Sequence, residues 1–292
     1  MNYSIENAQL SVTVSSFGAE LQNLVCKQTG VEYMWSGDPD FWGKKSPVLF
    51  PIVGALKNNT YFLNHNSYQL GRHGFAREKE FELKEKTSDS LLFMLKSDDE
   101  SLKIYPFEFE FLILYKIFGR SLKVTYTVKN TGKDSMCFSV GGHPAFKAPI
   151  FESDRYEDYI LKFEKNETTG RWPITKEGLI GKPPTPLLND ESVLKLKKEL
   201  FYTDAIVLKN LISESVSLLS TKQNRGIRFD FPGFSYLGIW AAKDADFVCI
   251  EPWCGIADSE DTNQSIINKE GINKLCAGAF FERAWTVSLI EK

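Results

Sequence analysis

Two short segments of this chain place a potential acid and a potential base where strands would end. The first is Gly141-Gly142-His143-Pro144, which directly follows a strand-like run over residues 121–139. Glycine permits a sharp turn and the close approach of a ligand, and proline cannot extend the ladder of a central strand. We therefore expect the His143 imidazole at a strand end, with its ring presented rather than packed.

The second segment is Ile250-Glu251-Pro252-Trp253, in which the glutamate follows an apolar strand and precedes a proline. We expect the Glu251 carboxylate at a sheet end near Trp253, where an apolar wall would raise its pKa toward neutrality. A histidine and a glutamate can form a general acid–base pair without a cofactor. Two alternatives stay open: a structural histidine bonded to the backbone, and a solvated carboxylate at a strand end.

A third segment, Gly71-Arg72-His73-Gly74-Phe75-Ala76-Arg77, frames another histidine with glycines and two arginines. Two cations beside a histidine suit a ligand that is rich in hydroxyls or carries a phosphate. A surface turn with solvated arginines would look the same. Asp204 precedes a strand-like segment and is a further ligand candidate, although an aspartate in a turn is the alternative.

The remaining polar candidates are weaker. Lys44 and Lys45 could form a basic rim, but a solvated loop is favoured, and His65 in a polar turn is expected to be exposed. The five cysteines, an odd number at wide spacing, make a poor disulfide framework and predict free thiols in a reducing compartment. Cys249 and Cys254 have no histidine nearby in sequence, which speaks against zinc, and Cys254 lacks the basic partner of a nucleophile.

Bulk composition excludes several classes of function. The chain has 292 residues, of which 42% are hydrophobic and 25% charged, and its net charge is -3. A protein that binds nucleic acid would show a basic face, and a polybasic membrane-surface protein would be strongly positive. The first residues lack the features of a signal peptide, and no apolar run reaches the ~20 residues of a spanning helix. We expect a cytoplasmic protein with neither nucleic-acid nor membrane partners.

The periodicity of the chain is mostly that of strands. Alternating or apolar runs of strand length, bounded by turn residues, occur at near-regular spacing, at residues 10–14, 17–26, 81–85, 90–96, 107–118, 122–128, 205–208, 215–219, 226–231, 247–250 and 285–290. Residues 107–118 and 122–128 are expected to form a hairpin. The best helical candidate is 191–201, and 144–156 and 171–186 are expected to be long loops. This pattern predicts an all-β fold, one large antiparallel β-sandwich with little helix, as a single domain over residues 1–292.

At these residues the chain resembles the aldose 1-epimerase (galactose mutarotase-like) family, and in particular its LacX-like branch. The resemblance rests on four segments that occur in family order: Leu49-Phe50-Pro51-Ile52-Val53-Gly54, the segment 71–77, Gly141-Gly142-His143-Pro144-Ala145-Phe146 and Ile250-Glu251-Pro252-Trp253. It implies a β-supersandwich and the interconversion of the α and β anomers of an aldose, without a metal or other cofactor. The implied partner is a small sugar, an aldohexose that is phosphorylated in some relatives.

The resemblance also implies residue roles. Glu251 would remove the proton of the anomeric hydroxyl, His143 would protonate the ring oxygen, and His73 would hydrogen-bond the sugar near that oxygen. Asp204 would match the sugar-binding aspartate of the family, and Trp253 would offer an aromatic surface to the sugar. Two residues exchanging a proton with the sugar suffice for ring opening, because one proton leaves a hydroxyl and one reaches an ether oxygen.

The chain departs from the family in one respect. Family members often carry an arginine just before the segment 49–54, where this chain offers Lys44 and Lys45, which lack the planar bidentate grip of arginine. Arg72 and Arg77 keep a hexose 6-phosphate mutarotase as an alternative. A carbohydrate-binding or sensing protein without turnover is a second alternative, since function belongs to the site and not to the fold. A hydrolase that uses Cys254 is a third.

Overall fold

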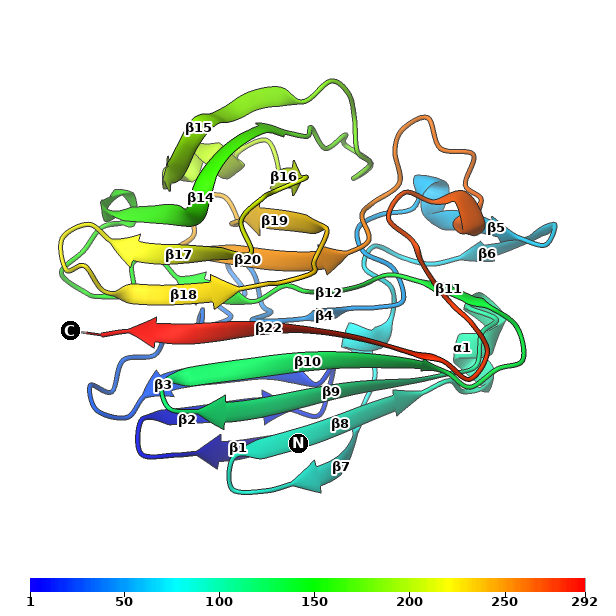
Figure 1. Ribbon diagram of the computed structural model, residues 1–292, viewed down its shortest axis with the longest axis horizontal. Helices are drawn as coiled ribbons and strands as arrows, with labels where there is room; N and C mark the ends of the chain where they lie inside the picture. Colours follow the sequence, from blue (N-terminus) through cyan, green and yellow to red (C-terminus); the bar gives the residue numbers. More distant parts are fainter. Residues whose placement is uncertain (292) are drawn as a thin grey trace.

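The computed structural model describes residues 1–291, which form strands joined by turns and by a few short helical segments (Figure 1). The α-helix and the 3-10 helices are α1 (Asp99–Ile104), η1 (Lys57–Asn59), η2 (Ala76–Glu78), η3 (Tyr156–Asp158), η4 (Lys198–Phe201) and η5 (Ile266–Asn268). The predicted all-β class with little helix is confirmed.

A long antiparallel sheet forms one layer. Across residues 1–291 it has nine strands, in the order β15 (Thr185–Lys195), β14 (Tyr159–Arg171), β17 (Ser215–Ser220), β18 (Gly226–Asp230), β22 (Phe280–Ile290), β10 (Ser121–Asn130), β9 (Phe109–Phe118), β8 (Ser90–Lys96) and β7 (Glu82–Lys86). The predicted hairpin is confirmed as β9–β10, whose register runs from Ser121 opposite Phe118 to Asn130 opposite Phe109.

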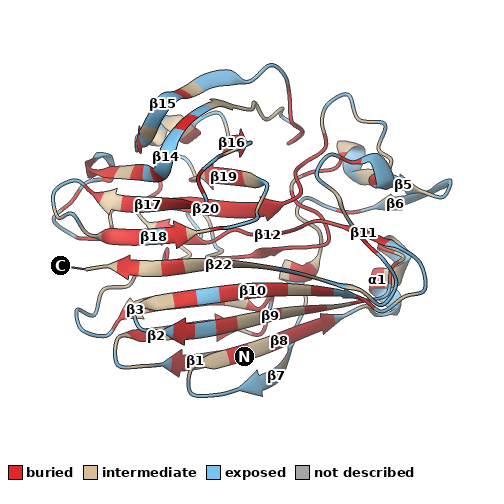
Figure 2. Ribbon diagram, in the orientation of Figure 1, coloured by how far each residue is buried: buried red, intermediate tan, exposed pale blue. Residues whose placement is uncertain are grey.

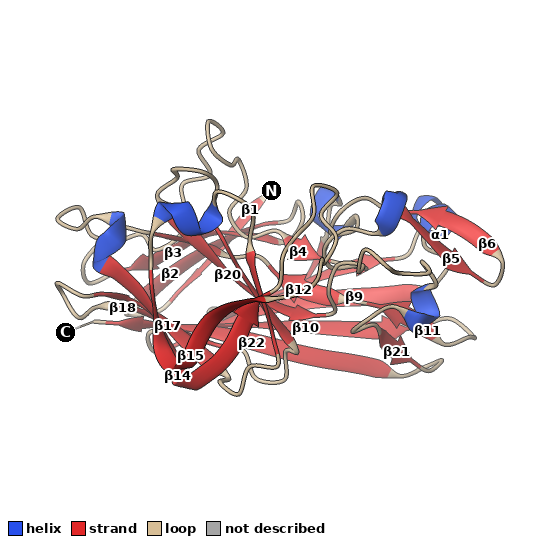
Figure 3. Cartoon of the chain, turned by 90° about the horizontal axis from the view of Figure 1, so that it is seen from above, coloured by secondary structure: helices blue, strands red, loops and turns tan. Residues whose placement is uncertain are grey.

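Two further sheets form the opposite layer, and Figure 3 shows the layers from above. One sheet has the order β1 (Asn2–Glu6), β2 (Leu10–Ser15), β3 (Glu20–Cys26). The other has the order β16 (Ile206–Lys209), β19 (Tyr236–Trp240), β20 (Phe247–Cys254), β12 (Val140–Gly142), β4 (Val48–Leu49), with β13 (Ala145–Lys147) also paired to β20. Two small pairs complete the strands, β5 (Thr60–Leu63) with β6 (Asn66–Gln69) and β11 (Met136–Phe138) with β21 (Asn273–Leu275).

The layers meet over a large apolar core. A Cβ atom at Gly142 of β12 would lie 2.8 Å from the Tyr126 hydroxyl and 3.0 Å from the Trp285 indole nitrogen, so β12 packs directly on β10 and β22. Trp285 donates a hydrogen bond to the Tyr126 hydroxyl at 2.9 Å, which satisfies both polar groups inside the core. Figure 2 shows that β20 is buried along its whole length, whereas β7 and β15 at the edges of the long sheet expose much of their surface.

The expected helix over residues 191–201 is wrong. Residues 185–195 form β15, which pairs with β14 and contains irregular register, and only residues 198–201 form a 3-10 turn. Leu194 and Leu196 stand two residues apart and are both buried, the alternation of a strand, but charged neighbours on the exposed side obscure it. The expected loops are largely confirmed, since 144–156 contains only β13 and the first residue of η3, and residues 172–184 connect β14 to β15.

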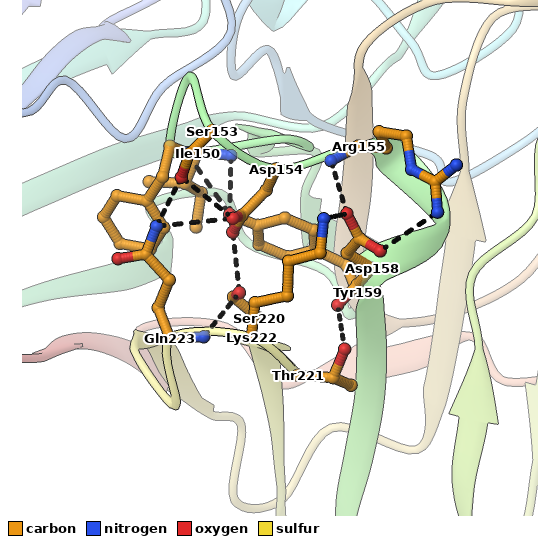
Figure 4. A network of polar contacts seen from close by, with 11 residues as sticks. Ile150, Ser153, Asp154, Arg155, Asp158, Tyr159, Ser220, Thr221, Lys222 and Gln223 are labelled. Carbon is orange, nitrogen blue, oxygen red and sulfur yellow. Dashed lines mark hydrogen bonds and ion pairs between the residues drawn. The ribbon is translucent and has the colours of Figure 1, made fainter.

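A network of polar side chains fixes the turn before β14 to the end of β17 (Figure 4). Asp154 accepts hydrogen bonds from Ser220 at 2.6 Å, from Tyr159 at 3.2 Å and from Gln223 at 3.3 Å. Asp158 forms an ion pair with Lys222 at 2.6 Å. The network is structural, because it lies away from the cavity described below.

Among the helices of residues 1–291, none combines the length and the apolar character needed to cross a membrane.

Candidate active site

The sheet register brings His143 and Glu251 face to face. β12 pairs Val140 with Cys254, and β13 pairs Ala145 with Cys249, on either side of a short interruption. Both pairings follow one register, and continuing it across the interruption sets His143 opposite Glu251. Directly opposite residues of antiparallel strands point to the same face. The two segments singled out in the sequence are therefore cross-strand neighbours.

Pro252 does not end the strand, contrary to expectation. β20 continues to Cys254, and Pro252 pairs with Leu237 of β19. Backbone donors of alternate residues face the same neighbour, and the Ile250 N–H bonds to the Pro144 carbonyl at 3.2 Å. The nitrogen of Pro252 accordingly points toward the interruption between β12 and β13. Proline has no N–H, and its missing hydrogen bond is tolerated there because the neighbouring strand is interrupted. Glu251 thus lies within the sheet and not at its end.

The acid–base candidates are close and almost fully enclosed. His143 Nε2 lies 3.2 Å from Glu251 Oε2, and the residues are 8% and 2% exposed. The expectation of a presented ring is wrong, because the ring of Trp42 lies against His143 with centroids 5.0 Å apart and Trp240 approaches it edge-on at 5.7 Å. These rings hold the imidazole in one orientation.

Burial sets the electrostatics of this pair. Removal from water lowers the pKa of His143, and the positive charge of Arg77 adds to the effect. Desolvation raises the pKa of Glu251 well above its ordinary value, opposed by the Trp253 side chain and reinforced by the charge of Asp204. Both shifts favour the uncharged forms, so the pair holds one proton that either partner can carry.

His73 is clamped by Gly54. The backbone N–H of His73 donates to the Gly54 carbonyl at 2.9 Å, and the Gly54 N–H donates to His73 Nδ1 at 3.1 Å. Because Nδ1 accepts, the neutral ring carries its proton on Nε2. Desolvation, with the charges of His143 and two arginines, lowers the pKa of His73 well below 6.5. The ring centroid lies 5.8 Å from that of His143, so a neutral donor stands beside the pair.

Trp253 is accommodated by two glycines on the flanking strands. A side chain at Gly238 of β19 would collide with the indole ring, and a Cβ at Gly141 of β12 would lie 2.8 Å from it. Trp253 and Glu251 point to the same face, two residues apart on β20. The indole therefore lies beside the carboxyl, and its polar N–H opposes the rise in the pKa of Glu251 that burial causes.

Loops supply the other predicted residues. Asp204 precedes β16, and its carboxylate accepts the Ala205 N–H at 2.7 Å. Arg171, at the end of β14, donates to the carbonyls of Leu200 at 2.9 Å and Asp204 at 2.6 Å and so ties this loop down. Arg72 packs against Gly178 of the 172–184 loop, and Arg77 donates to the Arg72 carbonyl at 3.0 Å.

The lysines do not form a basic rim on the cavity. The ammonium of Lys44 pairs with Glu78 at 3.1 Å, and that of Lys45 donates to the Gln22 carbonyl at 3.1 Å. His65 lies in the exposed turn between β5 and β6, as expected. All five cysteines have free thiols, four of them buried and Cys276 exposed. Desolvation raises the pKa of Cys254 to about 12, which opposes a role as a nucleophile.

A cavity of about 490 Å³ gathers these groups on the outer face of the β20 sheet. All seven residues predicted from the sequence line it: Arg72, His73, Arg77, His143, Asp204, Glu251 and Trp253. Sequence reasoning missed Trp42, Trp240 and the loop residues Ile174, Gly178 and Ile180. The tryptophans could have been suspected as aromatic residues of a sugar site, but their proximity to His143 depends on the pairing of distant strands.

Comparison with known proteins agrees with this geometry. The family model described as Aldose 1-epimerase matches residues 1–265. This chain belongs to the aldose 1-epimerase family. Among curated relatives, the plasmid and chromosomal LacX proteins of Lactococcus lactis subsp. lactis are each 33% identical over 301 residues, covering 99% of this chain and 100% of theirs.

Solved structures extend the likeness to the whole fold. A galactose mutarotase related enzyme from Lactobacillus acidophilus superposes with a TM-score of 0.94 at 35% identity, over 100% of this chain and 98% of that one. A galactose mutarotase-like protein from Lactobacillus casei gives a TM-score of 0.93 at 31% identity, over 99% and 100% of the two chains. The resemblance inferred from the sequence motifs is confirmed.

Proposed function

We propose that this protein interconverts the α and β anomers of an aldohexose by acid–base ring opening and reclosure in the cavity. The observation that carries the proposal is the 3.2 Å separation of His143 Nε2 and Glu251 Oε2 at the cavity wall. The two oxygens that exchange protons during ring opening are bonded to one carbon. A catalytic pair must therefore present its two groups side by side, as these residues do.

In the proposed reaction, Glu251 takes the proton from the anomeric hydroxyl while His143 gives a proton to the ring oxygen. The ring bond breaks to give the free aldehyde, the C1–C2 bond rotates, and reclosure from the other face reverses both transfers. His143 and Glu251 together hold one transferable proton both before and after ring opening, and again after reclosure. Each general acid or base step contributes on the order of 10²–10⁴-fold to the rate.

The electrostatics support such a two-way exchange. Burial raises the pKa of Glu251 and lowers that of His143, so the free protein favours the uncharged form of the pair, with the shared proton on Glu251. The form with the proton on His143 is the less populated one from which the step above begins. Whichever residue holds the proton can act as the acid, and the reverse step uses the other. This symmetry suits an enzyme that runs a reaction in both directions.

The neighbours have supporting roles in the proposal. His73 presents its Nε2–H to the sugar near the ring oxygen, as a neutral donor that does not compete for the transferred proton. Asp204 accepts hydrogen bonds from sugar hydroxyls, and Trp253 offers its apolar face. Trp42 and Trp240 exclude water from the imidazole.

Arg72 and Arg77 favour a second candidate substrate, a hexose phosphate. Both line the cavity, and buried Arg77 Nε makes no hydrogen bond among the described residues, its ion-pair partner Glu78 being 3.7 Å away. Arginine is well suited to hold phosphate oxygens. We therefore keep both a neutral and a phosphorylated aldohexose as substrates to be compared.

The test is polarimetry of freshly dissolved α-glucose, α-galactose and glucose 6-phosphate, with wild-type protein, His143→Asn and Glu251→Gln. We expect wild type to speed equilibration of at least one sugar, and each variant to lose 10²–10⁴-fold of that acceleration. Asp154→Asn serves as a control, because it alters a buried carboxylate outside the cavity.

The outcomes separate the candidates. Faster equilibration of the phosphorylated sugar, lost in Arg77→Met but not in Lys182→Met, would assign the phosphate to the arginines. Calorimetric binding of a sugar without any acceleration would identify a carbohydrate-binding protein. Acceleration that survives both His143→Asn and Glu251→Gln would refute the assigned pair.

A further inference from the structure

A third group with affinity for metals lies beside the His143–Glu251 pair. Cys249, Glu251 and His143 each offer one ligand atom, and the three atoms lie within 4.8 Å of one another. All three residues are buried. Cys249 and Glu251 stand two residues apart on β20 and point to the same face. Sequence spacing gives Cys249 no neighbouring histidine, but the strand pairing supplies one from across the sheet.

The separations approach those of a tetrahedral zinc site. Zinc binds nitrogen and oxygen at about 2.0–2.1 Å and sulfur at about 2.3 Å, so tetrahedral ligands lie about 3.3 Å apart for nitrogen and oxygen and about 3.6 Å apart where sulfur is involved. The 3.2 Å between His143 Nε2 and Glu251 Oε2 fits directly. The Cys249 sulfur would have to move about 1 Å closer to the other two ligand atoms to complete a tetrahedral ligand set.

Charge balance favours a divalent ion. The imidazole, the thiol and the carboxyl are all buried, and a net charge among them would be costly to remove from water. A divalent cation would displace two protons, one from the thiol and one from the His143–Glu251 pair. The product, with one thiolate, one carboxylate and a neutral imidazole, has no net charge, which limits the cost of burying an ion.

We propose that His143, Cys249 and Glu251 form a three-ligand site for a thiophilic divalent cation such as Zn²⁺, with the fourth position open to the cavity. A thiolate and an imidazole select zinc over magnesium or calcium, which prefer oxygen ligands. His143 and Glu251 line the cavity, which gives the ion an entry path and room for a water as fourth ligand, whereas Cys249 is fully buried and does not line it.

Occupation would remove both members of the acid–base pair. Zinc is therefore an inhibitor that competes with the sugar and that a chelator reverses. This consequence rests on the proposed function, whereas the binding itself does not. The same three residues thus give the protein a response to free zinc.

The binding test uses Co²⁺ as a spectroscopic probe in a Cys276→Ser background, which removes the exposed thiol. Coordination by a thiolate produces a sulfur-to-cobalt charge-transfer band in the near ultraviolet. We expect one Co²⁺ per chain with this band, its displacement by Zn²⁺, and no band with Cys249→Ala. Cys254→Ala is the matched control, because Cys254 is equally buried on β20 but an odd number of residues away, on the opposite face.

Calorimetry supplies the second readout. Zinc titrations in two buffers of different ionisation enthalpy should give release of two protons per ion near neutral pH, and Cys249→Ala should weaken zinc binding more than about 100-fold. A charge-transfer band that persists in Cys249→Ala, a band that Cys254→Ala abolishes instead, or no band in any variant would overturn the site.

Turnover measurements distinguish this inference from the proposed function. Each variant is compared with itself in a chelator, so that changes in basal activity cancel. If cobalt binds through Cys249 but the metal-free protein accelerates no sugar, the site stands and the proposed function fails. If the metal-free protein is active and saturating Zn²⁺ leaves its rate unchanged, the site is overturned while the function stands.

Discussion

Two buried carboxyl groups of this protein, Glu251 and Asp154, have opposite surroundings. Glu251 is 2% exposed and Asp154 is 6% exposed, so neither has much contact with solvent, although Asp154 lies nearer the surface. Burial alone would raise the pKa of Asp154, but hydrogen bonds from Ser220, Gln223 and Tyr159 outweigh it and lower that pKa (Figure 4). The carboxylate of Asp154 is charged and fully engaged.

Glu251 has fewer such donors, because only the Trp253 side chain acts on it in this way. Its main polar contact is His143, which can give or take the same proton, and the remaining wall is largely aromatic. Desolvation dominates, and the pKa is raised. The comparison teaches that burial does not decide the role of a carboxyl group, whereas its donors do. Several fixed donors make it a structural anchor, and a single exchangeable partner leaves its proton available for chemistry.

The largest expected effect concerns a third buried carboxylate, Asp258. Lys269 donates to it at 2.7 Å and the Lys57 N–H at 3.0 Å. Lys269→Met leaves this charge buried without its counter-ion and should lower the free energy of unfolding by about 3–5 kcal/mol, measured by urea denaturation. Lys182→Met, which breaks the exposed pair with Asp261, should cost less than about 1 kcal/mol. Equal losses in the two variants would contradict the role of burial.

The next largest loss of stability is expected on removal of the Asp154 carboxylate. Asp154→Ala takes away the acceptor of several buried hydrogen bonds and should lower the free energy of unfolding by about 1.5–3 kcal/mol. Ser153→Ala, which removes a contact at the edge of the same network, should cost less. Below the melting temperature of Asp154→Ala, its rate of mutarotation should match that of wild type. A large loss of rate would contradict a purely structural role for Asp154.

Glu251→Gln should raise the free energy of unfolding at neutral pH, whereas the two substitutions above lower it. Above pH 4.5 the unfolded chain releases the Glu251 proton and the folded chain keeps it, so wild type loses stability as pH rises toward the folded value. One unit of raised pKa corresponds to about 1.4 kcal/mol. Because the glutamine amide is itself imperfectly paired, we expect a net gain of about 1 kcal/mol at pH 7 that disappears below pH 4.5. Thermal denaturation of both proteins between about pH 4 and about pH 7 tests this expectation, with Glu282→Gln as an exposed control that should show no such gain.

The smallest effect is expected at Asp158. Hydrogen bonds from Lys222 and from the Arg155 backbone lower the pKa of Asp158 to about 2. A lowered pKa contributes stability above the unfolded value of 3.8 that is lost as pH falls toward 2. Asp158→Asn should melt slightly below wild type at pH 7 and converge with it by about pH 2. A difference that stays constant with pH would show that the carboxylate charge is not what matters.

The sequence predicted the lining of the cavity better than it predicted the secondary structure around it. The seven candidate residues stand in or beside local motifs of glycine, proline and apolar runs, and all seven line one cavity. Trp42 and Trp240 could not be found in this way, because their contacts with His143 depend on register between distant strands. The helix predicted for 191–201 failed because β15 is an exposed edge strand, whose charged positions weaken the period-two pattern.

The division of the cavity between sheet and loops has a consequence for how such a protein can change. His143 and Glu251 are set by paired backbone within one sheet, whereas Arg72, Asp204 and Ile174 stand on connecting segments. Loops tolerate insertions and substitutions that a buried strand does not. Exchange of the 172–184 segment or of the residues around Asp204 would thus change which ligand fits the cavity and leave the His143–Glu251 pair in place. In this fold, sequence changes during evolution would accumulate in the connecting segments around the cavity and leave the strands that carry His143 and Glu251 unchanged.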